Sequence, residues 1–248
     1  MVGGRAVPPK KPGQTLRENQ RWLSRQTLWI AFAAALVALL LIVAFLRELI
    51  AVLMGKRSPM RATIGMLLLI GMGVVIYLIQ FLDRRGRVFH IGAKGEERVG
   101  ATLETLRQHG WHIFHDISLP AVGNIDHVAV GTKGIFIVET KNHTGTIVLQ
   151  NGRLARAERP LEKDFVAQAM RQAVVLGQLI HQRTGLRVFV QPVVCFVRAR
   201  VMLQNPRVQQ AVVLSHAELL TYLHRHPDGR LTPAQVSAIA SVLTHLSR

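Results

Sequence analysis

Residues 123–145 read GNIDHVAVGTKGIFIVETKNHTG, and this stretch decides the fold of the C-terminal part of the chain. Apolar residues alternate on both sides of the turn sequence GTKG at 131–134, which predicts two strands over residues 124–130 and 134–141. The short turn between them favours an antiparallel hairpin, and the turn sets which residues of the two strands face each other.

Two carboxylates meet on one face of this hairpin. If Gly131 pairs with Gly134, Asp126 lies directly opposite Glu139, with Cβ atoms about 4.5–5.5 Å apart. Like charges at that distance repel each other, and a divalent cation would remove the cost. Oxygen ligands suit Mg²⁺ or Mn²⁺, which bind one or two carboxylates together with water and phosphate. Lys141 follows on the same face, where it could orient or deprotonate a water, or stabilise developing negative charge.

Two helical residues are predicted to join this constellation. Glu96 lies on the inward face of a helix predicted over residues 92–108, so it can point at the sheet. Gln168 lies on a later helix, predicted over residues 161–183, where it could touch a nucleotide or the surroundings of the metal. The joint spacing of these residues favours a functional site over isolated structural roles.

Simpler interpretations of the same residues remain open. Asp126 could satisfy a turn or a strand, and Glu139 could pair with Lys141 as a surface ion pair. A His/Asp metal site is a weaker alternative, formed by His115, Asp116, His127 and His143. It is disfavoured because His127 alternates away from Asp126, and a strand histidine usually only makes hydrogen bonds.

The rest of residues 83–248 predicts a single α/β domain. Strands are expected over residues 112–119, 145–150, 153–157, 187–197 and 210–214. Ser215 with Glu218 forms a capping box for one helix, and Thr232 before Pro233 begins the last helix. Cys195, the single cysteine, lies in an apolar run and is expected in the core, so a disulfide framework and a multi-cysteine zinc site are excluded.

Three stretches resemble the nuclease-related domain (NERD) family of the PD-(D/E)XK, restriction-endonuclease-like superfamily. They are GAKGEERVGATLETL (92–106), HDISLP (115–120) and the stretch 123–145 quoted above. The last is the most specific, with an IDH strand, a glycine turn and then GIF-x-x-E-x-K-x-x-x-G. The resemblance extends over about residues 90–245 and implies an αβββαβ core and Mg²⁺-dependent phosphodiester hydrolysis.

The resemblance also implies roles for single residues. Asp126 and Glu139 correspond to metal ligands, and the Thr140 carbonyl is a candidate third ligand. Lys141 corresponds to the catalytic lysine. The helix acidic residue and the glutamine that follows the sheet correspond to Glu96 and Gln168. Related nucleases often have Q-x-x-x-Y on that later helix, whereas here Gln168 is followed by Gln172, which puts the substrate role of the helix in doubt.

The charge of the chain fits a polyanionic substrate without requiring one. There are 31 Lys and Arg residues against 14 Asp and Glu, a net charge of +17, yet 49% of the chain is hydrophobic, which excludes a disordered basic tail protein. Five basic residues fall between the second hairpin and the helix of Gln168, where they could bind phosphates: Arg153, Arg156, Arg159, Lys163 and Arg171. A solvated surface, or attraction to anionic lipid, would explain them as well.

The hydrophobic excess lies near the N-terminus. Two segments, about 27–46 and 62–82, have the length and composition of membrane-spanning helices. A signal peptide is disfavoured for the first, because its polar lead is long, and a buried hairpin is disfavoured because the second offers no polar face. The sequence thus predicts a basic tail (1–25), a two-helix anchor (26–82) and a NERD-like domain (83–248).

Basic residues on both flanks of the predicted anchor favour cytoplasmic termini, in a multi-pass protein such as one of the bacterial inner membrane. The resulting hypothesis is a membrane-anchored, Mg²⁺-dependent nuclease acting on DNA or RNA. The alternative is a non-catalytic module that binds nucleic acid or protein at the membrane on a nuclease-like scaffold. Endo- or exonuclease action and the oligomeric state stay open.

Overall fold

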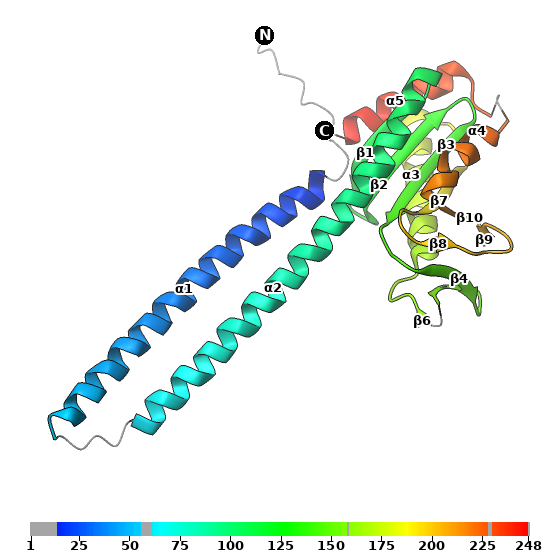
Figure 1. Cartoon of the computed structure of the whole chain (residues 1–248). Coiled ribbons are helices and arrows are strands. Elements are labelled where there is room, and N and C mark those ends of the chain that lie inside the picture. The colour runs from blue at the N-terminus through cyan, green and yellow to red at the C-terminus, as the bar shows by residue number, and fades with distance from the viewer. Residues whose placement is uncertain (1–13, 56–60, 158, 228–229, 248) are drawn as a thin grey trace, which may run out of the picture. The chain divides into compact units, whose positions relative to one another are not determined.

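The computed structural model describes residues 14–55, 61–157, 159–227 and 230–247. The chain divides into a helical unit, Leu16–His90, and an α/β unit, Ile91–Arg248, which are described separately below (Figure 1). Helix α2 (Arg61–Glu104) is continuous across this boundary. The helix predicted from residue 92 is therefore the end of a longer one, because no proline interrupts the sequence between residues 61 and 104.

The helical unit contains most of α1 (Gln14–Leu53) and the first part of α2. Residues 14–25 were expected in the basic tail but lie in α1, and they contain neither glycine nor proline. Among the described residues, one helical segment is long and apolar enough to cross a membrane, Leu28–Arg47, with a mean hydropathy of 2.9 and no burial. The second predicted span, 62–82, lies in α2, and many of its side chains are outside the described set, so the two-helix anchor is not confirmed.

The α/β unit is built on two sheets. Its strands are β1 (His112–Leu119), β2 (Gly123–Gly131), β3 (Gly134–Lys141), β4 (Thr146–Gln150), β5 (Arg153–Arg156), β6 (Arg159–Pro160), β7 (Val190–Phe196), β8 (Arg200–Val201), β9 (Arg207–Val208) and β10 (Ala211–Ser215). Within the described residues, the main sheet has the order β1-β2-β3-β7-β10-β9, and a smaller one has the order β6-β5-β4-β8. The short strands β6, β8 and β9 were not predicted.

The helices of this unit follow the strands in the expected order. They are η1 (Thr105–His109), α3 (Phe165–Thr184), η2 (His216–Glu218), α4 (Leu219–Arg225) and α5 (Pro233–Leu246). The mixed α/β fold is confirmed, and the order α2-β1-β2-β3-α3-β7 is that of an αβββαβ core into which β4–β6 are inserted. Helix α3 begins at Phe165 rather than at 161, because the Asp164 side chain caps it by accepting from the Ala167 N–H at 2.9 Å.

Alternation along the strands gives the main sheet two apolar faces. Ile135 and Ile137 belong to a core cluster with residues of α3 and α5, whereas Phe136 and Val138 belong to a second cluster with the end of α2 and with α4. Cys195 lies fully buried in the second cluster, as expected. Both faces are therefore covered by helices (Figure 1).

Candidate active site

The hairpin of β2 and β3 has the predicted register. Gly131 pairs with Gly134, and the pairing continues to His127 and Val138. Asp126 and Glu139 are the next residues along each strand, just beyond the last paired positions. The two carboxylates are therefore brought to the same end of the sheet, as the alternation of the sequence required.

Asp126 is partly buried, and it is bonded to the backbone of the opposite strand. Its Oδ2 atom accepts a hydrogen bond from the Thr140 N–H at 2.7 Å. Burial raises the pKa of Asp126 well above its ordinary value. The negative charges of Glu139 and Glu96 add to this effect, while Lys141 and the Thr140 N–H oppose it. The repulsion predicted between facing carboxylates is therefore present in the folded chain.

Glu139 accepts hydrogen bonds from two other side chains of the site. It is 2% exposed, and its Oε1 atom accepts hydrogen bonds from Lys141 Nζ at 2.5 Å and from Gln168 Nε2 at 2.8 Å. Its Oε2 atom is buried without a hydrogen-bond partner. A buried carboxylate oxygen is costly unless something positive or a donor satisfies it. The unsatisfied oxygen thus marks a place where a ligand would be stabilised.

Lys141 and Gln168 both reach Glu139 from the positions that the sequence suggested. The Lys141–Glu139 ion pair was considered as a surface pair, but Glu139 is buried, so the pair lies inside the site. Lys141 Nζ also lies 4.5 Å from the centre of the Phe165 ring, a cation–π contact at the start of α3. Phe165 was not anticipated, because sequence spacing does not show which helix covers the end of a strand.

Glu96 faces inward, as its spacing on the helix predicted. It is 8% exposed, and its pKa is raised to about 8, chiefly by burial and then by the charges of Asp116 and Glu139, while Lys141 opposes the rise. The carboxyl group is therefore mostly protonated at neutral pH in the absence of a cation. A neutral Glu96 adds little charge repulsion to Asp126 and Glu139.

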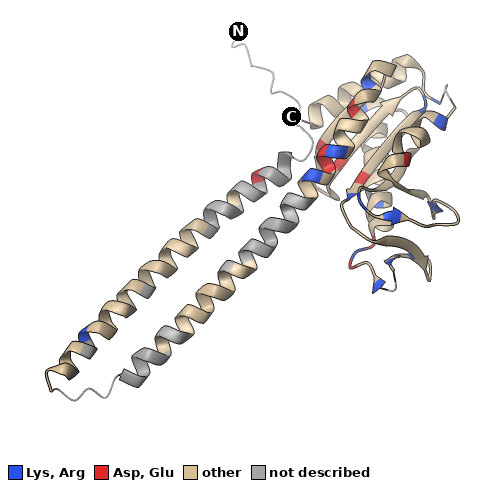
Figure 2. Ribbon diagram, in the orientation of Figure 1, with Lys and Arg blue, Asp and Glu red and all other residues tan. Residues whose placement is uncertain are grey.

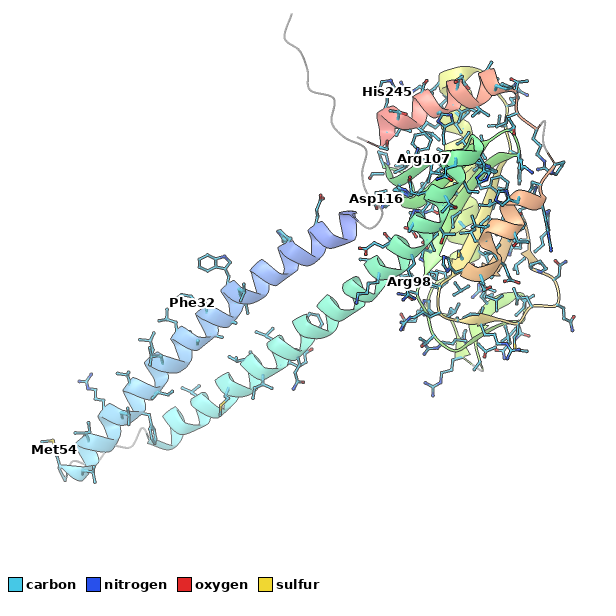
Figure 3. All side chains as sticks on the ribbon, turned by 45° about the horizontal axis from the view of Figure 1, so that its top comes forward. Phe32, Met54, Arg98, Arg107, Asp116 and His245 are labelled. Atoms are coloured by element: carbon cyan, nitrogen blue, oxygen red, sulfur yellow. The ribbon has the colours of Figure 1, made fainter. Side chains whose placement is uncertain are left out.

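Asp116 is the acidic residue whose place at this site sequence reasoning missed (labelled in Figure 3). The pairing of β1 with β2 matches His115 with His127 and Ile117 with Ile125, so Asp116 occupies the position opposite Asp126. Its backbone is left-handed, with a φ of 54°, a conformation that aspartate tolerates better than most residues. The side chain is 1% exposed, and its Oδ1 accepts from Asn124 Nδ2 at 2.7 Å. The HDISLP motif was the available signal for Asp116.

Gln172, which stands where related nucleases often have tyrosine, is buried at 1% exposure. Its Nε2 donates to the Asn124 carbonyl at 2.9 Å. Gln172 therefore fastens α3 to β2, and one helical turn earlier Gln168 reaches Glu139. Gln168 therefore lies at the candidate site, whereas Gln172 is enclosed by the protein.

The His/Asp metal site is not formed. His115 and His127 are buried on the face of the sheet covered by α2, where their Nδ1 atoms are 2.8 Å apart and His115 Nε2 lies 2.8 Å from Glu104 Oε1. His143 instead packs against the rings of Phe165 and Phe196. Across the described part of the chain, no three His, Cys, Asp or Glu side chains converge in a way that could hold a metal ion.

A cation at this site would therefore depend on the two predicted carboxylates and backbone oxygen. The residues fit such a role: Asp126 and Glu139 supply hard oxygen atoms, and Glu139 Oε2 is buried and unsatisfied. Magnesium needs few protein ligands, because it usually retains water and binds substrate phosphate. The Thr140 carbonyl remains a candidate for the third protein oxygen.

The predicted phosphate-binding residues do not all lie together. Arg156 and Arg159 line an open hollow of about 570 Å³ with Thr144, Gly145 and Thr146, in the chain that directly follows Lys141. The other three, Arg153, Lys163 and Arg171, are exposed and do not line this hollow. Figure 2 shows basic positions along the smaller sheet. The structure thus brings Arg156 and Arg159 to one surface, together with the segment that follows Lys141 in the chain.

One of the three comparisons with known proteins found a similarity, and it covers the part of the chain that contains this site. No curated protein and no solved structure matched the chain. One family model did match, from residue 91 to 197, so its extent includes all of the acidic residues described above together with Lys141 and Gln168, and it ends before β8. Residues 91–197 are similar to the nuclease-related domain (NERD) family.

Proposed function

We propose that the chain is a metal-dependent nuclease that hydrolyses phosphodiester bonds of DNA or RNA. The observation that supports this most is the hydrogen bonding of Glu139. Its Oε1 accepts from Lys141 and Gln168, while its Oε2 is buried without a partner. A buried ion pair with a spare oxygen, next to a second carboxylate, is poorly explained by stability alone. The match to the nuclease-related domain supports the same proposal.

Asp126 and Glu139 would hold Mg²⁺ or Mn²⁺, with the Thr140 carbonyl as a further ligand. Such a cation, when bound, neutralises the two carboxylates, lowers the pKa of water and offsets charge on a phosphate. The raised pKa of Asp126 supports this assignment, because the chain alone does not compensate the negative charge gathered there.

The other side chains of the site would position the reacting groups. Lys141 can stabilise negative charge that develops on phosphate oxygens, or hold the attacking water. Gln168 and Lys141 both bind Oε1 of Glu139, so its Oε2 is left without a partner and would be available to a cation. Glu96, as a protonated carboxyl, can donate a hydrogen bond without adding a third negative charge.

Arg156 and Arg159 would bind the substrate backbone beside the site. They line the hollow that begins at Thr144, three residues after Lys141, so phosphates flanking the cleaved bond would reach them. Guanidinium groups bind phosphate in a bidentate manner. The more dispersed Arg153, Lys163 and Arg171 would add a longer-range attraction that falls with salt.

The proposed location is a membrane, with both termini cytoplasmic, as in a protein of the bacterial inner membrane. The apolar segment Leu28–Arg47 of α1 supports one span, and residues 62–82 of α2 would supply the second. The basic residues at both flanks of this region support the orientation.

The test is cleavage of labelled DNA and RNA by the full chain in detergent, with Mg²⁺, Mn²⁺ or EDTA. Glu139→Gln and Lys141→Met keep the side-chain size and are expected to lose about a hundredfold or more in rate. Glu162→Gln removes an exposed carboxylate and is the matched control. Cleavage at the same rate by all four proteins would overturn the proposal, because the activity would then come from elsewhere.

The same assay separates the enzyme from a non-catalytic binding module. The module is expected to bind nucleic acid equally well in Mg²⁺ and in EDTA, to keep that affinity in Asp126→Asn, and never to cut. The enzyme is expected to bind Mn²⁺ at the site and to lose that binding in Asp126→Asn, which calorimetry measures without substrate.

A further inference from the structure

A second pocket lies at the end of the main sheet opposite the candidate active site. It has a volume of about 350 Å³ and begins at Gly134, Ile135 and Phe136, the first residues of β3. Lys141 is the last residue of the same strand, so the pocket is about 20 Å from the candidate active site. No residue of that site lines it.

The walls of this pocket combine positive charge with apolar surface. Arg187 and Arg230 are exposed and line it from two different loops, and none of the described lining residues is acidic. Ile135, Phe136 and Leu231 form apolar wall, and Phe189 lines the pocket with 57% of its surface exposed. Two guanidinium groups favour an anion such as a phosphate. An exposed aromatic ring beside them favours a planar group that can stack on it.

One buried polar side chain adds a specific hydrogen-bonding position. Gln191 lines the pocket and is 4% exposed, and its Nε2 donates to the carbonyls of Pro192 and Gln210. These two bonds fix the orientation of the Gln191 amide and use both of its N–H donors. The Oε1 atom can still accept a hydrogen bond. An acceptor of this kind suits a ligand that carries an N–H donor.

We propose that this pocket binds a nucleoside monophosphate. The phosphate would lie between Arg187 and Arg230, the base would stack on Phe189, and an N–H of the base would donate to Gln191. The volume is at the lower end of the range of small-molecule pockets, which suits one nucleotide rather than a chain of them. This site does not depend on the nuclease proposal, because it shares no residue with it.

The test is equilibrium dialysis of labelled adenosine 5′-monophosphate against the full chain in detergent. EDTA is present throughout, so that no cation draws the nucleotide to Asp126 and Glu139. The variants are Arg230→Glu and Phe189→Ser, both at exposed positions where folding should persist. Arg183→Glu makes the same charge change at an exposed position of α3 outside the pocket and is the matched control.

The expected result is saturable binding to the wild type and to the control. The dissociation constant is expected to rise by at least about tenfold in Arg230→Glu, and by about fivefold or more in Phe189→Ser. Equal binding by all variants would overturn the proposal. So would displacement of the nucleotide by inorganic phosphate at equal concentration, since the base would then contribute nothing. Loss of binding in Glu139→Gln would place the nucleotide in the candidate active site instead. That result would also overturn the proposal of a separate nucleotide pocket.

Discussion

The carboxyl group of Glu96 is held in its protonated form near neutral pH, since burial, Asp116 and Glu139 raise its pKa from 4.5 to about 8. Between these two values the folded chain retains a proton that the unfolded chain has lost. The stabilisation from this proton is fully present below pH 4.5 and is lost as the pH rises through 8. Glu96 therefore makes the free energy of unfolding fall with rising pH in this window.

We expect Glu96→Gln to remove this dependence. The variant should be more stable than the wild type at pH 8, by at most a few kcal/mol, and the difference should shrink toward pH 5. Hydrogen exchange of peptides from β2 and β3, measured in EDTA, reports the stability of this unit. Exposed Glu162→Gln serves as the control, and an equal pH slope in Glu96→Gln and the wild type would contradict the prediction.

Replacing Gly95 by alanine would have two opposing effects on stability, a gain in helix propensity and a close contact with Asn142. An alanine inside a helix is ordinarily more favourable than glycine by about 1 kcal/mol. A Cβ atom at Gly95, however, would lie 2.8 Å from Asn142 Cβ, the residue directly after Lys141. Arg198 holds Asn142 in place through its Oδ1 and its carbonyl, at 2.8 and 3.0 Å, so Asn142 has little freedom to yield.

The contact is therefore expected to outweigh the helix propensity. Gly95→Ala should lower stability by about 1–3 kcal/mol and should lower nuclease activity, because it displaces the chain next to Lys141. Gly177→Ala, in α3, is the matched control, since its Cβ would meet neighbours only at 3.6 Å. Recovery of activity in Gly95→Ala combined with Asn142→Gly would identify the contact as the cause, and full activity of Gly95→Ala alone would disprove it.

At the scale of elements, the start of α3 determines where Gln168 lies. Asp164 caps this helix by accepting from the Ala167 N–H, and Gln168 follows within the first turn. Asp164→Ala should cost about 1 kcal/mol of unfolding free energy and should weaken Mn²⁺ binding by loosening the bond of Gln168 to Glu139. Asp164→Asn keeps an acceptor and is expected to behave as the wild type in calorimetry. Equal stability of Asp164→Ala and Asp164→Asn would show that the cap is dispensable.

The elements that the sequence predicted best are those set by local contacts. The register of β2 and β3 follows from a short turn and strict alternation, so the neighbouring positions of Asp126 and Glu139 were predictable. The capping box of Ser215 with Glu218 is equally local and is present, and the last helix begins at Pro233 after Thr232, as predicted. The continuity of α2 was harder to predict, because the glycines within residues 61–104 weaken a helix without ending it.

The remaining parts of the site depend on contacts between residues far apart in the chain. Alternation places Asp116 on β1, but its positive φ and its bond from Asn124 arise only when β1 pairs with β2. The bond from Gln168 to Glu139 requires α3 to cross the end of β3, and Gln172 fixes that crossing through the Asn124 carbonyl. A sequence shows which residue types are present, but not which helix lies over which strand end.

On the scale of the whole molecule, charge and hydrophobicity are separated along the chain. The apolar excess lies in Leu28–Arg47 and in the predicted second span, while residues 83–248 contain 21 basic and 12 acidic residues, a net charge of +9. The basic tail and the anchor region together account for the remaining +8 of the +17. Almost half of the net charge therefore lies at or beside the proposed membrane anchor rather than near the candidate active site. In that position the charge would attract anionic lipid headgroups and favour one orientation of the anchor in the membrane.

The proposed topology can be tested by labelling introduced cysteines, because the only native cysteine, Cys195, is buried. Cys195 is fully buried, so a membrane-impermeant maleimide should not label the native wild-type chain in intact cells or in lysed ones. If both termini are cytoplasmic, a cysteine at Ser58 should be labelled in intact cells, because residues 47–61 would lie outside. A cysteine at Ser241, which is exposed on α5, should be labelled only after lysis. Labelling of Ser58→Cys and Ser241→Cys under the same single condition would mean that the chain does not cross the membrane twice, and the anchor would then be the one span Leu28–Arg47 or none.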